Sequence, residues 1–358
     1  MSEQNNQNIQ ESQTPHKRRV RYKGKYPKKF EEKYKELQPE KYQETVEHVI
    51  RKGNTPAGMH ISIMVKEILD FLDIQPGQTG FDATLGYGGH TKAMLECLKG
   101  QGHIYATDVD PEESAKTKKR LEEQGFGEKI LTVCLQNFCT IDEIAEKVGG
   151  FDFILADLGV SSMQIDNPKR GFSFKADGPL DLRLNQEKGI SAAERLDTIS
   201  REELAGMLYE NSDEPYCEEL AKAITDEIRR GNRIDTTTKL RNVIEKTLSF
   251  LPDNKEKKDI VKKTCQRTFQ ALRIDVNNEF EVLYEFMEKL PDALRPGGRV
   301  AILTFHSGED KLVKKALKAG YKAGIYSDYA KDVIRPSAQE CAKNGRARST
   351  KMRWAVKA

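Results

Sequence analysis

The stretch Asp82-Ala-Thr-Leu-Gly86-Tyr-Gly88-Gly89-His90 decides the fold, because its glycines are typical of a bend between a strand and a helix. Residues 79–81 predict the strand, and the apolar residues at helical spacing predict a helix over 91–98. Glycines adopt positive φ and allow a ligand to approach the backbone, while the N–H groups of a helix start point at that ligand. The stretch therefore predicts a pocket for a nucleotide-like ligand, with a glycine turn of some other α/β protein as the alternative.

The spacing of the glycines helps to distinguish between classes of nucleotide-like ligand. The dinucleotide fingerprint Gly-x-Gly-x-x-Gly, counted from Gly86, would need a glycine where Thr91 stands. An acidic residue at the strand end followed by Gly-x-Gly-Gly favours S-adenosylmethionine, which has no pyrophosphate. A second predicted strand, 103–107, ends at Asp108, where a carboxylate can bind the ribose hydroxyls of an adenosine. Asp110 is assigned to the N-cap of the next helix, although either carboxylate could cap it.

Length and composition restrict the class of protein. A chain of 358 residues exceeds one usual core, so we expect two domains or a domain with an insertion. No run of 18 apolar residues exists, and the polar start lacks the apolar region of a secretory signal. The six cysteines form no Cys-x-x-Cys pair and are expected to be reduced. We therefore expect a cytoplasmic protein with no membrane partner and no metal.

Charge is distributed unevenly along the chain. Residues 1–60 carry 13 Lys/Arg and 8 Asp/Glu, and the eight basic residues between Lys17 and Lys29 are interleaved with Tyr22 and Tyr26. Basic side chains neutralise phosphates and aromatic rings stack on bases, so residues 1–59 are predicted to be a basic, partly disordered extension that contacts RNA. A solvated tail is an equal alternative.

Strands alternate with helices beyond the glycine loop, which predicts a mostly parallel, doubly wound α/β sheet. A third strand is predicted over 129–135 and a fourth over 151–156, ending at Asp157. Ligands bind at the carboxyl ends of such strands. The glycine loop, Asp108, Phe138 and Asp157 are all expected at this edge of the sheet.

The alternation then stops and later resumes. Residues 165–263 show helices but no good strand, and predict an all-helical inserted domain for RNA recognition. Residues 60–164 and 264–358 are predicted to form the main domain. Within 264–358, a helix over 264–273, a strand over 299–305 and a closing strand at the sheet edge, 351–356, are expected.

Polar residues at the strand ends suggest an enzyme that transfers a group to an amine. A carboxylate at Asp157 could accept a hydrogen bond from an exocyclic amine and orient it, although it could also cap the next turn. His306, after the predicted strand 299–305, could act as a base, contact a phosphate or serve structure alone. Four arginines could bind RNA phosphates, namely Arg170, Arg183, Arg346 and Arg348. Phe172 and Phe174 could stack on bases or pack in the core.

A series of ordered motifs over about residues 60–358 resembles the bacterial ribosomal RNA small-subunit methyltransferase H family. The motifs are His60-x-x-x-Met64 with Glu67, the glycine loop from Asp82 to His90, Asp157-Leu-Gly-Val-Ser-Ser-x-Gln164, Arg170-Gly-Phe-Ser-Phe174, Pro179-Leu-Asp-Leu-Arg183, Thr268-Phe-Gln-Ala-Leu-Arg273, Phe305-His-Ser307 with Glu309-Asp310, and Asn344-x-Arg-Ala-Arg-Ser349.

The resemblance implies a class I S-adenosylmethionine methyltransferase with a Rossmann-like sheet and a helical insertion. It also implies N4-methylation of cytosine 1402 of 16S rRNA, in the P-site part of the decoding centre of the small subunit. A homodimer is left open. The implied cofactor contacts are Gly88, Gly89 and His90 at the methionine end, Asp108 on the ribose, Phe138 beside the adenine, and Asp157 and Gln164 near the reacting end.

The chain departs from the family at three positions. Gly308 and Gly345 replace a usual leucine and a usual proline, and Lys311 replaces an arginine, which loses bidentate phosphate recognition if that side chain touches RNA. Two other classes remain to be weighed: a nicotinamide dehydrogenase, and an RNA-binding or assembly factor without catalytic activity.

Overall fold

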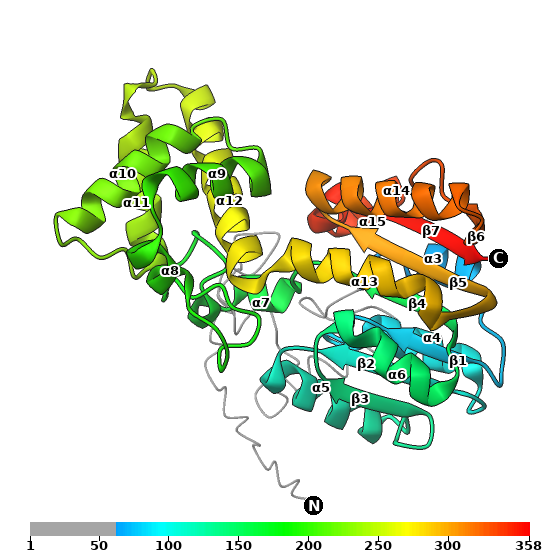
Figure 1. The fold of residues 1–358 in the computed structure, drawn as a ribbon. Helices are drawn as coiled ribbons and strands as arrows, with labels where there is room; N and C mark the ends of the chain where they lie inside the picture. Colours follow the sequence, from blue (N-terminus) through cyan, green and yellow to red (C-terminus); the bar gives the residue numbers. More distant parts are fainter. Residues whose placement is uncertain (1–61) are drawn as a thin grey trace, which may run out of the picture. The chain divides into compact units, whose positions relative to one another are not determined.

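A computed structural model describes residues 62–358, which lie in one compact unit of the chain. The predictions for residues 1–61, the basic extension included, lie outside the described residues. The sheet has seven strands in the order β3-β2-β1-β4-β5-β7-β6 (Figure 1). The strands are β1 Thr79–Asp82, β2 His103–Asp108, β3 Leu131–Leu135, β4 Phe151–Asp157, β5 Leu294–Thr304, β6 Tyr326–Tyr329 and β7 Lys351–Lys357.

The first five strands are parallel, as the alternating pattern predicted. β1 lies between β2 and β4, so the strand order reverses between β1 and β4, and this switch point is where open α/β sheets bind ligands. The prediction that the closing strand lies at the sheet edge is wrong. β7 pairs antiparallel with both β5 and β6, and the unpredicted β6 forms the edge.

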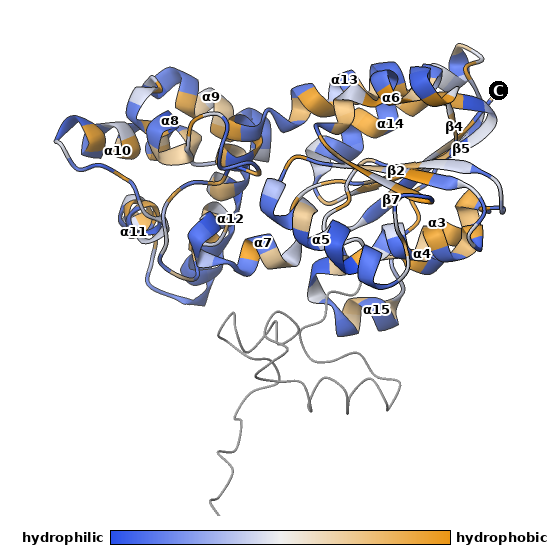
Figure 2. Ribbon diagram, turned by 90° about the horizontal axis from the view of Figure 1, so that it is seen from below, coloured by the Kyte–Doolittle hydropathy of each residue, from blue (hydrophilic) through white to orange (hydrophobic). Residues whose placement is uncertain are grey.

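Helices cover both faces of the sheet because the central strands are apolar on both sides. In β4, Ile154 and Ala156 pack against one core and Phe153 and Leu155 against the other. Figure 2 shows helices on both sides of the strands. One face carries α6 Ile141–Val148, α13 Glu279–Ala293 and α14 Ser307–Lys322, and the other carries α3 Val65–Leu72, α4 Gly89–Leu98 and α5 Pro111–Glu123.

The segment between β4 and α13 is helical and has its own apolar core. It contains α7 Ser162–Asp166, α8 Ala192–Thr198, α9 Arg201–Ser212, α10 Cys217–Arg229, α11 Thr237–Thr247 and α12 Lys255–Asn277. Helix α12 is longer than the predicted helix 264–273, so the predicted domain boundary at 263 falls inside a continuous helix. Asn278, in the left-handed conformation with φ 49°, turns the chain from α12 into α13. No helix in residues 62–358 has both the length and the apolar character to cross a membrane.

Candidate active site

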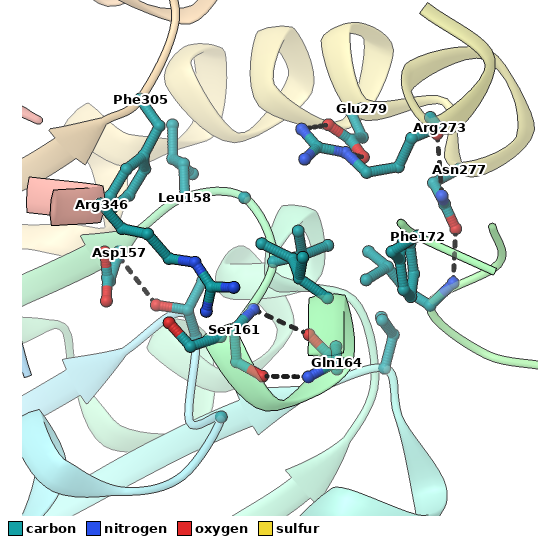
Figure 3. A pocket seen from close by; sticks show the side chains of 18 of the residues that line it. Asp157, Leu158, Ser161, Gln164, Phe172, Arg273, Asn277, Glu279, Phe305 and Arg346 are labelled. Carbon is teal, nitrogen blue, oxygen red and sulfur yellow. Dashed lines mark hydrogen bonds and ion pairs between the residues drawn. The ribbon is translucent and has the colours of Figure 1, made fainter. Parts of the chain in front are cut away.

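A cavity of about 590 Å³ lies at the carboxyl edge of the sheet. The loops after the five parallel strands line one part of it, and segments of the helical region line the rest. Figure 3 shows Asp157, Phe305 and Arg346 on one side of the pocket, and Phe172 with the Arg273–Glu279 pair on the other. The edge predicted from the sequence is therefore where the pocket lies.

The glycine loop passes close to its neighbours at Gly88 and Gly89. Gly88 has φ 74°, and a Cβ there would lie 2.7 Å from Thr117 Cγ2; a Cβ on Gly89 would lie 2.0 Å from Ser62 Oγ. Gly88 is also the N-cap of α4 and supplies no side-chain cap, which leaves the helix start open toward the pocket. This geometry would allow the loop to bring backbone N–H groups to a ligand.

The side chain of Asp82 anchors the glycine loop through hydrogen bonds. Its carboxylate accepts hydrogen bonds from the Thr84 N–H and the Thr91 hydroxyl, at 3.0 and 2.7 Å. The position at which a dinucleotide fingerprint needs glycine is thus occupied by a buried threonine that anchors the loop. Burial raises the pKa of Asp82, and the threonine hydrogen bonds partly offset that rise.

Asp108 lies at the end of β2 and lines the pocket. Its carboxylate accepts the Gly86 N–H at 2.8 Å and the Asp110 N–H at 2.9 Å. Burial raises its pKa to about 6, although both hydrogen bonds act in the opposite direction. Each oxygen keeps a lone pair, so the carboxylate can still accept from ribose hydroxyls. Asp110 caps α5 through the Glu112 and Glu113 N–H groups, which confirms its predicted role.

Arg170 has no exposed guanidinium for the phosphate contact predicted from the sequence. Its guanidinium is buried and pairs with Asp110 at 2.6 Å. It also donates to the carbonyls of Arg183 and Leu184. The Gln164 amide donates to the same Asp110 oxygen at 3.0 Å and accepts the Ser161 N–H at 2.9 Å. These contacts connect the loop after β4 to the start of the helical region.

Asp157 ends β4 and is held on two sides. Its N–H donates to Thr84 Oγ1 at 2.8 Å, and its Oδ2 lies 3.4 Å from Nδ1 of the buried His90. Its Oδ1 is buried and has no hydrogen-bond partner within the described chain. Sequence reasoning missed Thr84, although the spacing Asp82-x-Thr84 places it at the strand end facing β4.

His306 caps α14 and also lines the pocket. Its Nδ1 accepts the Glu309 N–H at 3.4 Å, and its Nε2 lies 3.2 Å from Glu309 Oε1. Burial would raise the pKa of Glu309, but the contact with His306 leads the interactions that lower it overall. Of the roles weighed for His306, the geometry supports the structural one, since one ring nitrogen accepts the Glu309 N–H and the other lies beside the Glu309 carboxylate.

Three aromatic rings predicted at the site, together with Phe305, line the pocket in different ways. Phe172 is buried in the core of the helical region, and Phe174 packs edge-on against Phe269 at 5.7 Å. Phe138 packs edge-on against Phe286 at 5.2 Å. Phe305 is half-buried at the end of β5, beside Gly159. Its strand, β5, pairs with β4, which carries Asp157 at its end.

The remaining predicted arginines differ in whether an ion pair already holds the side chain. Arg183 is held by Asp181 at 2.7 Å, and Arg346 pairs with Asp166 at 2.7 Å while lining the pocket. Arg348 is exposed and makes no ion pair with residues 62–358. Lys175, which sequence reasoning did not select, is likewise exposed on the pocket lining.

Glu279, His306 and Glu309 bring their ligand atoms within 4.8 Å of one another. Glu279 is already paired side-on with Arg273, at 2.8 and 2.9 Å. This arginine supplies the positive charge of the cluster.

The pocket fits S-adenosylmethionine in its donor set. The backbone cradle at Gly88 and Gly89 suits the amino-acid end, Asp108 suits the ribose and Phe138 suits an adenine. The unpartnered Asp157 Oδ1 is an acceptor that a substrate amine could satisfy.

A sequence profile of the MraW methylase family matches residues 57–358. Curated relatives are similar in sequence over nearly the whole chain. Ribosomal RNA small subunit methyltransferase H 1 of Agathobacter rectalis is 86% identical and covers 96% of this chain and 98% of its own. The protein of the same name from Lachnoclostridium phytofermentans is 70% identical, over 97% and 95%. Ribosomal RNA small subunit methyltransferase H 2 of Alkaliphilus metalliredigens is 62% identical, over 95% and 97%.

Proposed function

This chain belongs to the MraW methylase family, and we propose that it methylates N4 of a single cytosine of 16S rRNA in the small ribosomal subunit. S-adenosylmethionine, when bound, supplies an electrophilic methyl group. Methyl transfer to small-subunit rRNA is supported by the names of the relatives. The choice of a base amine is supported by one observation, the buried and unpartnered Oδ1 of Asp157.

An exocyclic amine is a poor nucleophile because its lone pair is delocalised into the ring. Asp157 Oδ1 accepts a hydrogen bond from the amine, which orients the nitrogen and favours attack. Orientation is worth up to about 7–11 kcal/mol in well-aligned reactions. The nitrogen must lose one proton after it gains the methyl group, and Asp157 Oδ1 or water can take it, so no strong base is needed. His306 has no part in this step.

Phe305 is the proposed stacking partner of the flipped base. It follows β5, next to the strand that carries Asp157, and it is only half-buried. Phe172 and Phe174 are better explained as packing within the helical region. Each stacked base is worth about 1–3 kcal/mol in complexes of this kind.

The helical region, residues 165–263 in the predicted division, is proposed to contact the RNA around the target base. It contributes Phe172, Phe174 and Lys175 to the pocket lining, and the adjoining α12 contributes Gln266 and Gln270. Lys175 and Arg348 are exposed cations without an ion pair in the described part of the chain, so they are the proposed phosphate contacts. Arg170 and Arg183 are assigned to structure.

The test uses small subunits from cells that lack this protein, incubated with S-adenosylmethionine labelled on its methyl group. The RNA is digested and the labelled nucleoside is identified by chromatography and mass spectrometry. The proposal requires N4-methylcytidine, and subunits from normal cells, already modified, should accept no label. A label on a ribose or another base atom would refute the amine assignment. RNA binding without any transfer would favour the assembly-factor alternative. A parallel sample of naked rRNA shows whether the assembled subunit is needed.

A further inference from the structure

The hydrogen bonds of His90 fix where its protons are. Nε2 lies 2.9 Å from the carbonyl oxygen of Ile63. A carbonyl oxygen only accepts hydrogen bonds, so Nε2 must carry a hydrogen. Nδ1 then faces Asp157 Oδ2 across 3.4 Å, and the His90 side chain is 8% exposed.

A bare Nδ1 would place two lone pairs opposite each other in a buried space. The charged groups that face His90 from the packed elements are Asp157 at the end of β4 and Asp82 at the end of β1, and both are acids. Burial lowers the pKa of His90, but the hydrogen bond and charge of Asp157, the Ile63 carbonyl and Asp82 together raise it overall. A proton between Nδ1 and Oδ2 relieves the repulsion.

We propose that His90 is a positioning residue for methyl transfer, which shares one proton with Asp157 Oδ2 and thereby leaves Oδ1 to receive the amine of the base. This inference rests on the proposed function. The ring is anchored at Ile63, so it holds the carboxylate in one orientation. Asp157 Oδ1, which is buried and has no hydrogen-bond partner within the described residues, is the carboxylate oxygen that this pairing leaves available.

The pairing has a pH signature. When the shared proton is lost at alkaline pH, Nδ1 repels Oδ2 and the carboxylate loses its orientation. The turnover rate should therefore fall on the alkaline side with the loss of one proton. A histidine that only supported the cofactor loop would produce no such limb in the rate at saturating cofactor.

The first experiment compares wild type, His90→Gln and the control His103→Gln, whose histidine lies at the start of β2, outside the pocket lining. Cofactor affinity is measured by calorimetry, and turnover is measured with saturating S-adenosylmethionine and small subunits across the histidine pH range. We expect His90→Gln to lower turnover at least about tenfold, equivalent to about 1.4 kcal/mol, and to abolish the alkaline limb. His103→Gln should match wild type. The inference would be overturned if His90→Gln kept the wild-type turnover and pH profile. It would also be overturned if the variant reached wild-type turnover once the cofactor concentration was raised enough to saturate it.

The second experiment does not depend on activity. The ring nitrogens of His90 are titrated by NMR in the wild-type protein and in Asp157→Asn, with His90→Gln used to assign the signal. The pKa of His90 should be higher in the wild type than in Asp157→Asn, and equal values would show that no proton is shared. Failure of wild type to methylate subunits would instead refute the proposed function, so the two failures are distinguishable.

Discussion

Arg170→Met should destabilise the protein and leave its RNA contacts unchanged. In the native structure Arg170 is 5% exposed and its partner Asp110 is 1% exposed. The pair is 2.6 Å apart, and the second guanidinium nitrogen donates to two backbone carbonyls. Methionine fills much of the same space but leaves the Asp110 carboxylate buried without its cation.

The size of the effect follows from that unpaired charge. Removing one partner of a buried ion pair costs about 3–5 kcal/mol. For a folded unit of about 300 residues, the unfolding entropy is about 0.6 kcal/mol/K, so the melting temperature should fall by about 5–8 °C. Gln164 still donates to Asp110, so the lower end of this range is the expected minimum.

The assay combines thermal unfolding with the salt dependence of binding to small-subunit RNA. Lys169→Met is the matched control, because Lys169 lies in the same short 3-10 helix, is exposed and makes no ion pair within the described residues. Arg170→Met should lower the melting temperature and keep the salt slope, whereas Lys169→Met should keep the melting temperature. A normal melting temperature for Arg170→Met, together with a slope reduced by about one, would return Arg170 to the RNA interface and refute the structural assignment.

Four further outcomes are expected. Gly88→Ala should weaken S-adenosylmethionine binding at least about tenfold in calorimetry, because positive φ costs a side chain about 1–2 kcal/mol and its Cβ would crowd Thr117; Gly127→Ala, with open space around it, should not. Cofactor affinity should fall as the pH drops below about 6, since protonated Asp108 is a poorer acceptor, and Asp108→Asn should lose this dependence. The same raised pKa means that protonating Asp108 favours the folded state, so its contribution to stability should grow as the pH falls through about 6, as denaturant titrations would show. Phe305→Leu should lower kcat/KM about 5- to 150-fold if one base stacks on the ring, and an unchanged value would remove Phe305 from the site.

The central strands and the glycine loop were predictable because their signals are local. The apolar run of β4 and the glycine spacing each occupy fewer than ten neighbouring residues. β6 was missed because it has only four residues, Tyr326–Tyr329, and its two middle residues are exposed and polar. Without β6, the closing strand β7 could only be placed at the edge.

Helix α12 was predicted too short for a related reason. Its first turns, from Lys255, are highly charged and mostly exposed, so no apolar periodicity marks them. The only local signal is Asn254, whose side chain accepts the Lys257 N–H as an N-cap.

At the site, too, features set by neighbouring residues were predictable and contacts between distant residues were not. The strand-end positions of Asp108 and Asp157 followed from topology. The role of Arg170 did not, because its partner Asp110 lies 60 residues away and no local pattern connects them. His306 could have been identified as a cap, since a glutamate three residues later resembles a capping box.

The most direct test of the account is the state of 16S rRNA in cells that lack the native gene and carry either the wild-type protein or Asp157→Ala. Mass spectrometry of the digested rRNA reads the methylated nucleoside, and immunoblotting confirms that both proteins accumulate. The account predicts that the wild type restores N4-methylcytidine and that Asp157→Ala restores at most about a tenth of it. Full restoration by Asp157→Ala, or a methyl group on any atom other than the cytosine amine, would contradict it.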